Sequence, residues 1–502
     1  MGNKLTWEKL LSETRLKPSS SQNNGKQKYG IRNDFESDYG RIIYSPAIRR
    51  MHDKTQVFPL SDDDNIHTRL THSQEVMSIG YTFAIKLIGE IYDEKNKNIV
   101  EADFNFLKDK EENSDDNETI RAKLLRTLPM ILQSVCLFHD IGNTPFGHFG
   151  EEIISSYFDE LFKRNEEEGK KSLSINKLQE LDFTEYDGNA QGLRVLTKLQ
   201  ILDNIFGLNL TSAILGTYIK YPNIKAKEKK GGVIGNKKHG VFFSEYNYFE
   251  KIMENCGLKD GDIYYRHPLC FLMEAADTIA YRTMDVEDGF NKGLYTVDYI
   301  IEKVKKDNKD IAFLAKLSEI ETEKSNERTR MVRLRIFLID YLVTESFKIF
   351  INNYSDIMNG KYQKELLDDD SLEIEKKLSD ICTDKIYDSE EVNSLEVTGY
   401  SVITGLLDFY INAITNDKNS KNNGNGLEKK AYNLISKSII NSAIFEKAEE
   451  DGKDKIDITE FDFEDFTKLD DYRKLRIIVD YISGMTDKYA LMHYQKISGQ
   501  RI

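Results

Sequence analysis

The chain has 502 residues, with 70 Lys and Arg against 85 Asp and Glu, so its formal net charge is −15. Hydrophobic residues make up 39% of it, and 27 Tyr and 26 Phe supply much of the apolar surface. This composition excludes an intrinsically disordered chain, a collagen-like chain and a disulfide scaffold. The acidic balance also argues against a general duplex-DNA binder, because phosphate binding needs clustered Lys and Arg.

At about 150 residues per domain, the length predicts about three domains or one large core with insertions. The sequence contains no run of about 18 apolar residues, the length that a membrane span needs, and its first residues lack the apolar stretch of a secretory signal. The four cysteines are widely spaced without a CxxC pair, which is typical of reduced, buried thiols. We therefore expect a cytoplasmic protein with no membrane association.

Helical periodicity dominates the chain. Residues 71–92 carry apolar side chains at spacings of three and four, and Thr71 and Gln74 suit the cap and N3 positions of that helix. A second helix is predicted over 129–141, with Pro129 in its first turn and Gly142 just after its end.

The apolar spacing over 268–288 predicts a third helix. Brief strands are expected only at Val241–Phe243 and Ile263–Tyr265. Polar, breaker-rich stretches predict surface loops or insertions at 17–28, 107–119, 223–240 and 416–430. The fold class is mostly α with little β.

Four residues form a candidate metal site. His139 and Asp140 are adjacent at the end of an apolar helix, His72 opens another helix, and Asp277 interrupts an apolar one. A set of two imidazoles and two carboxylates suits a borderline or hard divalent ion with positions left for water and phosphate. Taken singly, each residue has an ordinary alternative, since a buried Asp on a helix pairs more often with Lys or Arg than with a metal.

Two further patterns suggest catalysis and ligand binding. His148 and Glu151 lie three apart in a glycine-rich stretch, as in a carboxylate-oriented imidazole that moves a proton; a simple turn-tightening pair is the alternative. Tyr281 and Asp285 follow Asp277 at i+4 and i+8 and share its helix face, either as a pocket wall or as a solvated acidic face.

Residues 41–60 hold four basic side chains against one acid, and Arg69 lies three residues before His72. Local positive charge beside a divalent ion is what a polyphosphate ligand needs. Taken by itself, this segment is more typical of a solvated surface patch.

The segments TRLTHS, FHDIGNTPFGHFGE and EAADTIAYRTMDVED, in the order H…HD…D, resemble the HD-superfamily phosphohydrolases, specifically the bacterial deoxyguanosine triphosphate triphosphohydrolases. GNAQGLRVL, IKYP and DYISGMTDKYAL extend the similarity from about residue 28 to 496. The resemblance implies an N-terminal segment (1–27), an HD-domain helical core (28–300) with loop insertions at about 100–120 and 223–240, and a C-terminal helical region (301–502) packed on that core.

The family's metal ligands match His72, His139, Asp140 and Asp277, and its catalytic pair matches His148 and Glu151. Its substrate contacts match Gln56 near the base and sugar, Arg69 at the phosphates, Tyr281 beneath the deoxyribose and Asp285 at the 3′-hydroxyl. Further substrate contacts match Asn189, Lys220, Tyr221 and Lys238. Arg473 and Arg476 are candidates for the family's C-terminal phosphate-binding arginines.

The resemblance implies hydrolysis of dGTP to deoxyguanosine and inorganic triphosphate, by attack of water on the α-phosphorus. It also implies one divalent ion per site, Mg²⁺ or Mn²⁺, and assembly into hexamers. There are three alternatives, of which the first stays open and the other two are less well supported. A broad dNTP triphosphohydrolase shares every one of these residues. A 5′-nucleotidase or alarmone hydrolase lacks GHFGE together with GNAQ and KYP. A non-catalytic nucleotide sensor, or a weak single-stranded DNA binder using the lysine-rich 224–238 loop, belongs to a different functional class.

Overall fold

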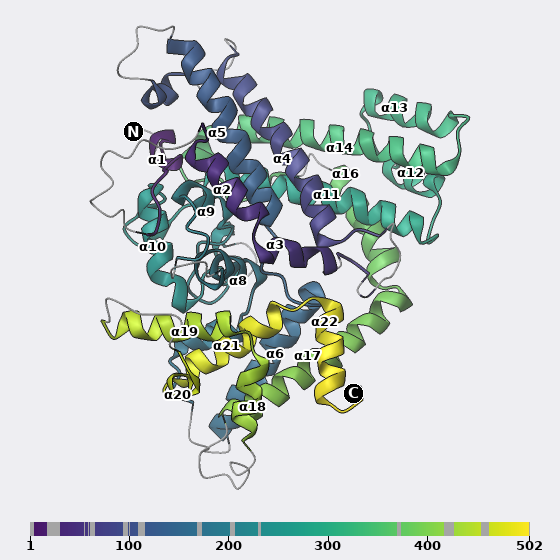
Figure 1. Cartoon of the computed structure of the whole chain (residues 1–502). Coiled ribbons are helices and arrows are strands. Elements are labelled where there is room, and N and C mark those ends of the chain that lie inside the picture. Colours follow the sequence, from purple (N-terminus) through teal and green to yellow (C-terminus); the bar gives the residue numbers. More distant parts are fainter. Residues whose placement is uncertain are drawn as a thin grey trace.

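A computed structural model describes residues 5–17, 31–54, 56–58, 60, 66–93, 99, 101–108, 116–167, 173–200, 206–228, 232–368, 373–415, 426–452 and 461–500. The fold is mostly α, as predicted (Figure 1). Among the described residues the only sheet is a hairpin of β1 (Lys259–Asp260) and β2 (Ile263–Tyr264), paired antiparallel. No helix in the described part of the chain is both long and apolar enough to cross a membrane.

The helices of the first half are α1 (Trp7–Leu10), α2 (Asp34–Ile43), α3 (Pro46–Arg50), α4 (Arg69–Ile91), α5 (Asp116–Phe138), α6 (Gly147–Glu167), α7 (Lys177–Thr184), α8 (Gly188–Arg194), α9 (Ser212–Tyr218) and α10 (Tyr246–Asn255). Those of the second half are α11 (Pro268–Asn291), α12 (Val297–Lys305), α13 (Ile311–Thr322), α14 (Glu327–Asn352), α15 (Tyr354–Met358), α16 (Glu373–Cys382), α17 (Glu390–Thr415), α18 (Leu427–Leu434), α19 (Lys437–Glu450), α20 (Phe463–Thr467), α21 (Asp471–Ser483) and α22 (Asp487–Ile497).

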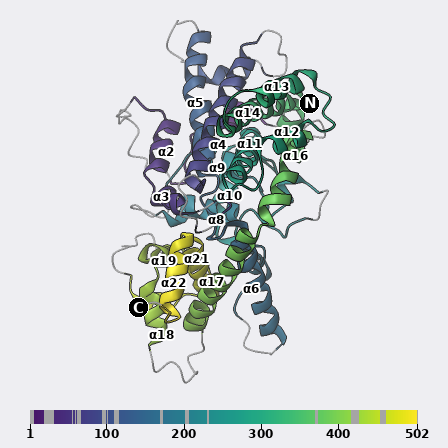
Figure 2. The same cartoon turned by 90° about the vertical axis from the view of Figure 1, so that its right-hand side faces the viewer.

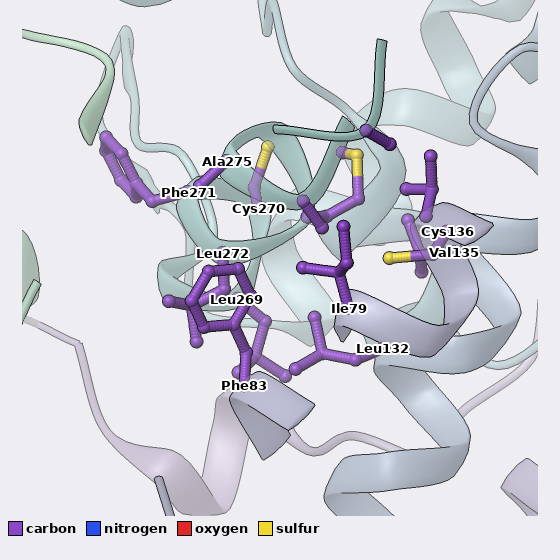
Figure 3. Close-up of a cluster of buried hydrophobic side chains, with 14 of the residues drawn as sticks. Ile79, Phe83, Leu132, Val135, Cys136, Leu269, Cys270, Phe271, Leu272 and Ala275 are labelled. Carbon is purple, nitrogen blue, oxygen red and sulfur yellow. The ribbon is translucent and has the colours of Figure 1, made fainter. Parts of the chain in front are cut away.

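Two hydrophobic cores organise these helices. In the first, α4 packs along α5, and both contact α11, which α14 and α16 cover. Figure 3 shows its centre, where Ile79 and Phe83 of α4 meet Leu132 and Cys136 of α5 and Leu272 of α11. These buried apolar contacts hold α4, α5 and α11 together, and the candidate metal ligands lie on or next to these helices.

The second core joins α6, α7 and α8 to the C-terminal helices α17–α22, the group at the bottom of Figure 1. Figure 2 shows α6 and α17 below the helices of the first core, and the two helices are in contact. Because α6 begins at Gly147, seven residues after Asp140, the chain passes from the first core to the second close to the candidate site. The predicted division at residues 27 and 300 stays a prediction.

Several local predictions were right and others wrong. The helix over 268–288 is confirmed as α11, with His267 as its cap and Pro268 in its first turn. The cap of α4 was wrong: Thr68 caps the helix and Thr71 takes the N3 position, because their side chains and backbone amides bond reciprocally. Strand Ile263–Tyr265 is confirmed over its first two residues. The predicted strand Val241–Phe243 was wrong: Val241 and Phe242 lie in neither a strand nor a helix, and Phe243 begins a 3₁₀ turn over Phe243–Glu245.

The second predicted helix starts earlier than expected. It begins at Asp116, as α5, so Pro129 lies inside the helix and not in its first turn. A proline removes the hydrogen bond to the carbonyl four residues before it, here that of Leu125, whose residue is 45% exposed. The helix continues through Pro129 although this hydrogen bond is missing. Gly142 was expected to mark the end of this helix. In the structure it permits close packing, because a Cβ there would collide with the backbone of Gly188 and Gly192. The predicted loops at 17–28, 107–119 and 416–430 lie largely outside the described residues.

Candidate active site

Three of the four predicted metal ligands converge. Nε2 of His72, on α4, and Nε2 of His139, after α5, lie 3.2 and 3.1 Å from the same oxygen, Oδ1 of Asp277 on α11. Their candidate ligand atoms all lie within 4.8 Å of one another. Residues 205 positions apart in the sequence thus meet at one point, because α4, α5 and α11 pack together beneath them.

The protonation of His139 fits a metal ligand. Its Nδ1 lies 2.8 Å from the carbonyl oxygen of Cys136, which can only accept, so Nδ1 carries a hydrogen and Nε2 is the nitrogen that faces Asp277. That buried Nε2 has no hydrogen bond of normal geometry among the described residues. Burial opposes protonation of His139, but the Asp277 and Asp140 carboxylates outweigh it and raise the pKa of His139, and a bound cation would take the place of that proton. A ring hydrogen held by a backbone carbonyl is also the usual orientation of metal-binding histidines.

Asp140 lies at the edge of this group. Its Oδ1 is 3.5 Å from Nε2 of His139, and its Oδ2 accepts a hydrogen bond of 2.5 Å from Nη1 of Arg69. Burial opposes ionisation of Asp140, but His139 and Arg69 together hold its pKa below the ordinary value. Asp140 therefore links the histidine cluster to the cation that the family resemblance assigns to the phosphates.

Lys220 bonds to Asp277 as Arg69 does to Asp140. Its Nζ donates to Oδ2 of Asp277 at 2.9 Å. Burial raises the pKa of Asp277, yet Lys220 and His139 outweigh it and hold that pKa well below the usual range. The carboxylate is thus ionised at neutral pH, as a metal ligand must be.

The predicted catalytic pair is formed and faces solvent. Nδ1 of His148 lies 3.3 Å from Oε2 of Glu151, and the His148 side chain is 73% exposed whereas Glu151 is buried. Glu151 raises the pKa of His148 by its charge and its hydrogen bond. Both residues line a cavity of about 690 Å³ that also contains Asp187, Lys238 and His239.

Asn189 and Lys238 share one carboxylate in this cavity. Asp187 accepts from the backbone and side-chain amides of Asn189, both at 2.8 Å, and from Nζ of Lys238 at 2.6 Å. Nζ of Lys238 also lies 5.9 Å from the ring centroid of Tyr221. Asp187 is a site residue that the sequence reading missed, although its place before the GNAQ segment was a usable signal.

Tyr281 and Asp285 lie on α11 beyond Asp277, and the backbone amide of Gln56 donates to the carbonyl of His67, two residues before α4. Oε1 of Gln56 and Oδ1 of Asp285 are buried without a hydrogen-bonded partner among the described residues. Oδ2 of Asp285 accepts from the hydroxyl of Tyr387 at 2.6 Å, and the Arg282 guanidinium lies over the ring of Tyr281, 4.6 Å from its centroid. Tyr387 was missed because it lies 102 residues beyond Asp285, and no spacing rule reaches that far.

The two candidate C-terminal arginines bond within the fold. Arg473 pairs with Asp470 and Glu450, and Arg476 is buried, donating to Gln191 and Asp480. Their part in phosphate binding stays a prediction.

The mostly helical fold and the phosphate-compatible cluster of imidazoles, carboxylates and cations are those of a phosphohydrolase. Residues 457–496 match the family model described as a phosphohydrolase-associated domain. A deoxyguanosinetriphosphate triphosphohydrolase-like protein of Listeria innocua is 32% identical, covering 99% of this chain and 100% of the relative, and one of Synechocystis is 30% identical over 99% of both. A deoxyguanosinetriphosphate triphosphohydrolase of Yersinia pestis is 29% identical over 96% of this chain and 97% of the relative.

The chain therefore belongs to the deoxyguanosinetriphosphate triphosphohydrolase family and is a hydrolase.

Proposed function

We propose that the protein hydrolyses dGTP to deoxyguanosine and inorganic triphosphate, with water attacking the α-phosphorus and the nucleoside 5′-oxygen leaving. The observation that carries this proposal is the convergence of His72, His139 and Asp277 on one point, flanked by Arg69 and Lys220. Imidazole and carboxylate ligands beside two buried cations suit a divalent ion and a polyphosphate together. Full-length similarity to relatives with this activity in their names supports the substrate.

One divalent ion, Mg²⁺ or Mn²⁺, would be held by His72, His139, Asp140 and Asp277. When bound, it supplies positive charge at the α-phosphate, which makes the phosphorus more electrophilic. Arg69 and Lys220 neutralise the triphosphate and fix its orientation for in-line attack. His148 is held by Glu151, and its raised pKa favours the protonated ring, which donates a proton to the leaving 5′-oxygen.

The remaining predicted contacts select the nucleoside. Tyr281 lies beneath the deoxyribose and excludes a 2′-hydroxyl, and the buried oxygens of Gln56 and Asp285 accept from the sugar and base. Asn189, Tyr221 and Lys238 complete the pocket near Asp187. The resemblance extends the proposal to a hexamer in the cytoplasm and to weak binding of single-stranded DNA; sedimentation of the purified protein tests the assembly.

Product analysis tests the reaction. The purified protein is incubated with each dNTP and with GTP, in Mg²⁺ or Mn²⁺, and the products are resolved by ion-exchange chromatography. Triphosphate and deoxyguanosine from dGTP alone are the expected outcome. Triphosphate from several dNTPs would replace strict guanine specificity by the broad alternative, whereas single phosphate or pyrophosphate would refute the proposed bond cleavage. No turnover, also with mixed nucleotides that could act as activators, would favour the non-catalytic sensor.

A further inference from the structure

The loop that presents His148 has an unusual backbone. In the catalytic loop, defined as residues 143–148, Phe146 and Gly147 have φ of 62° and 61°, in the left-handed region. Glycine adopts this conformation freely, whereas a bulky aromatic residue does so only when its surroundings enforce it. At Gly147 a Cβ would also approach Nη2 of Arg69 to 2.9 Å. The two turned residues thus set the direction of His148 and leave room for Arg69.

The C-terminal segment supplies the contact that holds Phe146. The backbone amide of Phe146 donates to Oδ1 of Asp487 at 3.0 Å, in a buried hydrogen bond between residues 341 positions apart. Asp487 begins α22 and is 3% exposed. The ring of Phe146 packs into the second core and contacts α17 at Gly399, where a Cβ would lie 2.8 Å from the ring.

A second contact ties the start of the catalytic loop to the same segment. The buried ammonium of Lys54 donates to the carbonyl of Asn143 and, at 2.9 Å, to the carbonyl of Ser483. The carbonyl of Lys54 in turn accepts from the backbone amide of Arg69 at 2.9 Å. Lys54 therefore joins three elements: the catalytic loop, the first turn of α4 and the end of α21.

A third contact fixes the neighbouring helix. Asp480 on α21 accepts from the side chains of Gln191 and Arg194 at 3.0 Å or less, all in the buried interior. These two residues lie on α8, which also carries Asn189. Asp480, Ser483 and Asp487 all fall within the 457–496 match to the phosphohydrolase-associated domain.

We infer that the phosphohydrolase-associated segment is the anchor of the catalytic loop, and that Asp487 is a positioning residue for His148. This inference rests on the proposed function, since it assigns the segment a part in that reaction. Asp487 is neither one of the candidate metal ligands nor one of the residues assigned to substrate contact. Its carboxylate fixes the amide of Phe146, so the left-handed turn is the stable conformation and His148 points into the cavity that it shares with Lys238.

Loss of the acceptor at residue 487 has a specific consequence. The Phe146 amide would be buried without a partner, and the left-handed turn would relax toward ordinary backbone angles. His148 would then be displaced, while His72, His139 and Asp277 keep their places on the first core. A misplaced proton donor lowers kcat more than it raises KM, because the substrate is held mainly by other residues.

Three variants of the full-length protein test the inference. Asp487→Ala removes the acceptor, and we expect kcat for triphosphate release from dGTP to fall by at least about tenfold, with KM changed by less than about threefold. Asp487→Asn keeps an oxygen that accepts from Phe146, so it should retain most of the activity. Asp471→Ala is the matched control: it removes another carboxylate of the same segment, which accepts from the backbone amide of Ser174 at 2.9 Å rather than from the catalytic loop.

Hydrogen–deuterium exchange supplies a readout that does not depend on substrate. In the wild-type protein the Phe146 amide should be protected, and in Asp487→Ala peptides covering 143–150 should exchange at least about tenfold faster while peptides of α4 and α11 stay unchanged.

Wild-type kcat in Asp487→Ala, an equal loss in Asp471→Ala, or rapid exchange of Phe146 in the wild type would each overturn the inference. If Asp487→Ala fails to fold, the wild-type exchange and the Asp487→Asn kinetics still decide. If wild-type protein releases no triphosphate from dGTP, the proposed function fails separately, and the exchange data alone judge the anchor.

Discussion

Substitution of Gly188 by alanine should lower the turnover rate without unfolding the protein. Gly188 is the first residue of α8, and a Cβ built there would lie 2.4 Å from Oδ1 of Asn143 and 2.5 Å from Oε1 of Glu151, both at the ends of side chains. Ordinary contact begins at about 3.4 Å, so the Glu151 carboxylate must withdraw by about 0.9 Å. Its other oxygen now lies 3.3 Å from Nδ1 of His148, and a withdrawal of that size takes the pair beyond hydrogen-bond distance.

The expected magnitude follows from this displacement. A catalytic group misplaced by about 1 Å can lower a rate by about 10²-fold, so we expect kcat of Gly188→Ala to fall between about tenfold and 10²-fold. Stability should fall by less than about 3 kcal/mol, the usual cost of one extra methyl group in a packed site, because the neighbours that yield are the ends of side chains.

The assay is triphosphate release from saturating dGTP, together with urea unfolding of each variant. Gly89→Ala is the matched control, since Gly89 lies on α4 with no atom within 4 Å of an added Cβ. Alanine there should leave kcat unchanged and raise the free energy of unfolding by about 0.5–1 kcal/mol. A folded Gly188→Ala variant with wild-type kcat would refute the argued dependence of turnover on the His148–Glu151 contact.

Four other variants test separate parts of the site. His139→Ala should lose bound divalent metal, measured by elemental analysis, together with activity, and metal retained at wild-type stoichiometry would contradict the ligand assignment. His148→Ala should keep metal and KM but lose at least about 10²-fold in kcat, and an unchanged kcat removes it from the mechanism. Tyr281→Ala should reduce the preference for dGTP over GTP in kcat/KM; an unaltered ratio rules out its sugar-selecting role. Burial raises the pKa of Asp285 to about 7, against about 3.9 in an unfolded chain, so the wild-type free energy of unfolding should fall as pH rises from about 4 to 7. Asp285→Asn removes this titration and should gain stability over the wild type at pH 8 but not at pH 4.5 in urea unfolding; an equal difference at both pH values would show that the group does not titrate as argued.

Short-range patterns in the sequence were sufficient for the helices that carry the site. Apolar residues at helical spacing located α11, and the H…HD…D order selected His72, His139 and Asp277, which converge in the structure. Local signals failed where a neighbour changed their meaning. Thr71 looks like a cap, but Thr68 three residues earlier takes that position because the two threonines bond reciprocally. Pro129 looks like a helix start, yet the turns before it continue the helix.

Contacts between distant segments could not be predicted in this way. Tyr387 bonds Asp285 across 102 residues, and Asp487 bonds the amide of Phe146 across 341. Neither partner is marked by spacing or composition. Tyr387 reaches Asp285 because residues 383–387 pack on α11 in the first core, and Asp487 reaches Phe146 through the packing of the second core. The match over 457–496 identifies the segment that holds Phe146, but its contact with the catalytic loop is visible only in three dimensions.

The predicted phosphate-binding cations also hold the carboxylates of the site in their ionised form. Arg69 pairs with Asp140, Lys220 with Asp277 and Lys238 with Asp187. Burial alone would raise the pKa of each carboxyl group, and in all three the neighbouring positive charges reverse that effect and lower it.

A carboxylate that is protonated near neutral pH cannot ligate a metal, so removing Lys220 would affect Asp277 as well as a bound phosphate. A substitution of a phosphate-binding cation is therefore expected to affect metal binding as well, because the cation pairs with a candidate metal ligand. This coupling explains why the motifs are informative only as a set: each cation and its carboxylate come from different parts of the chain, and neither residue type is diagnostic without the other.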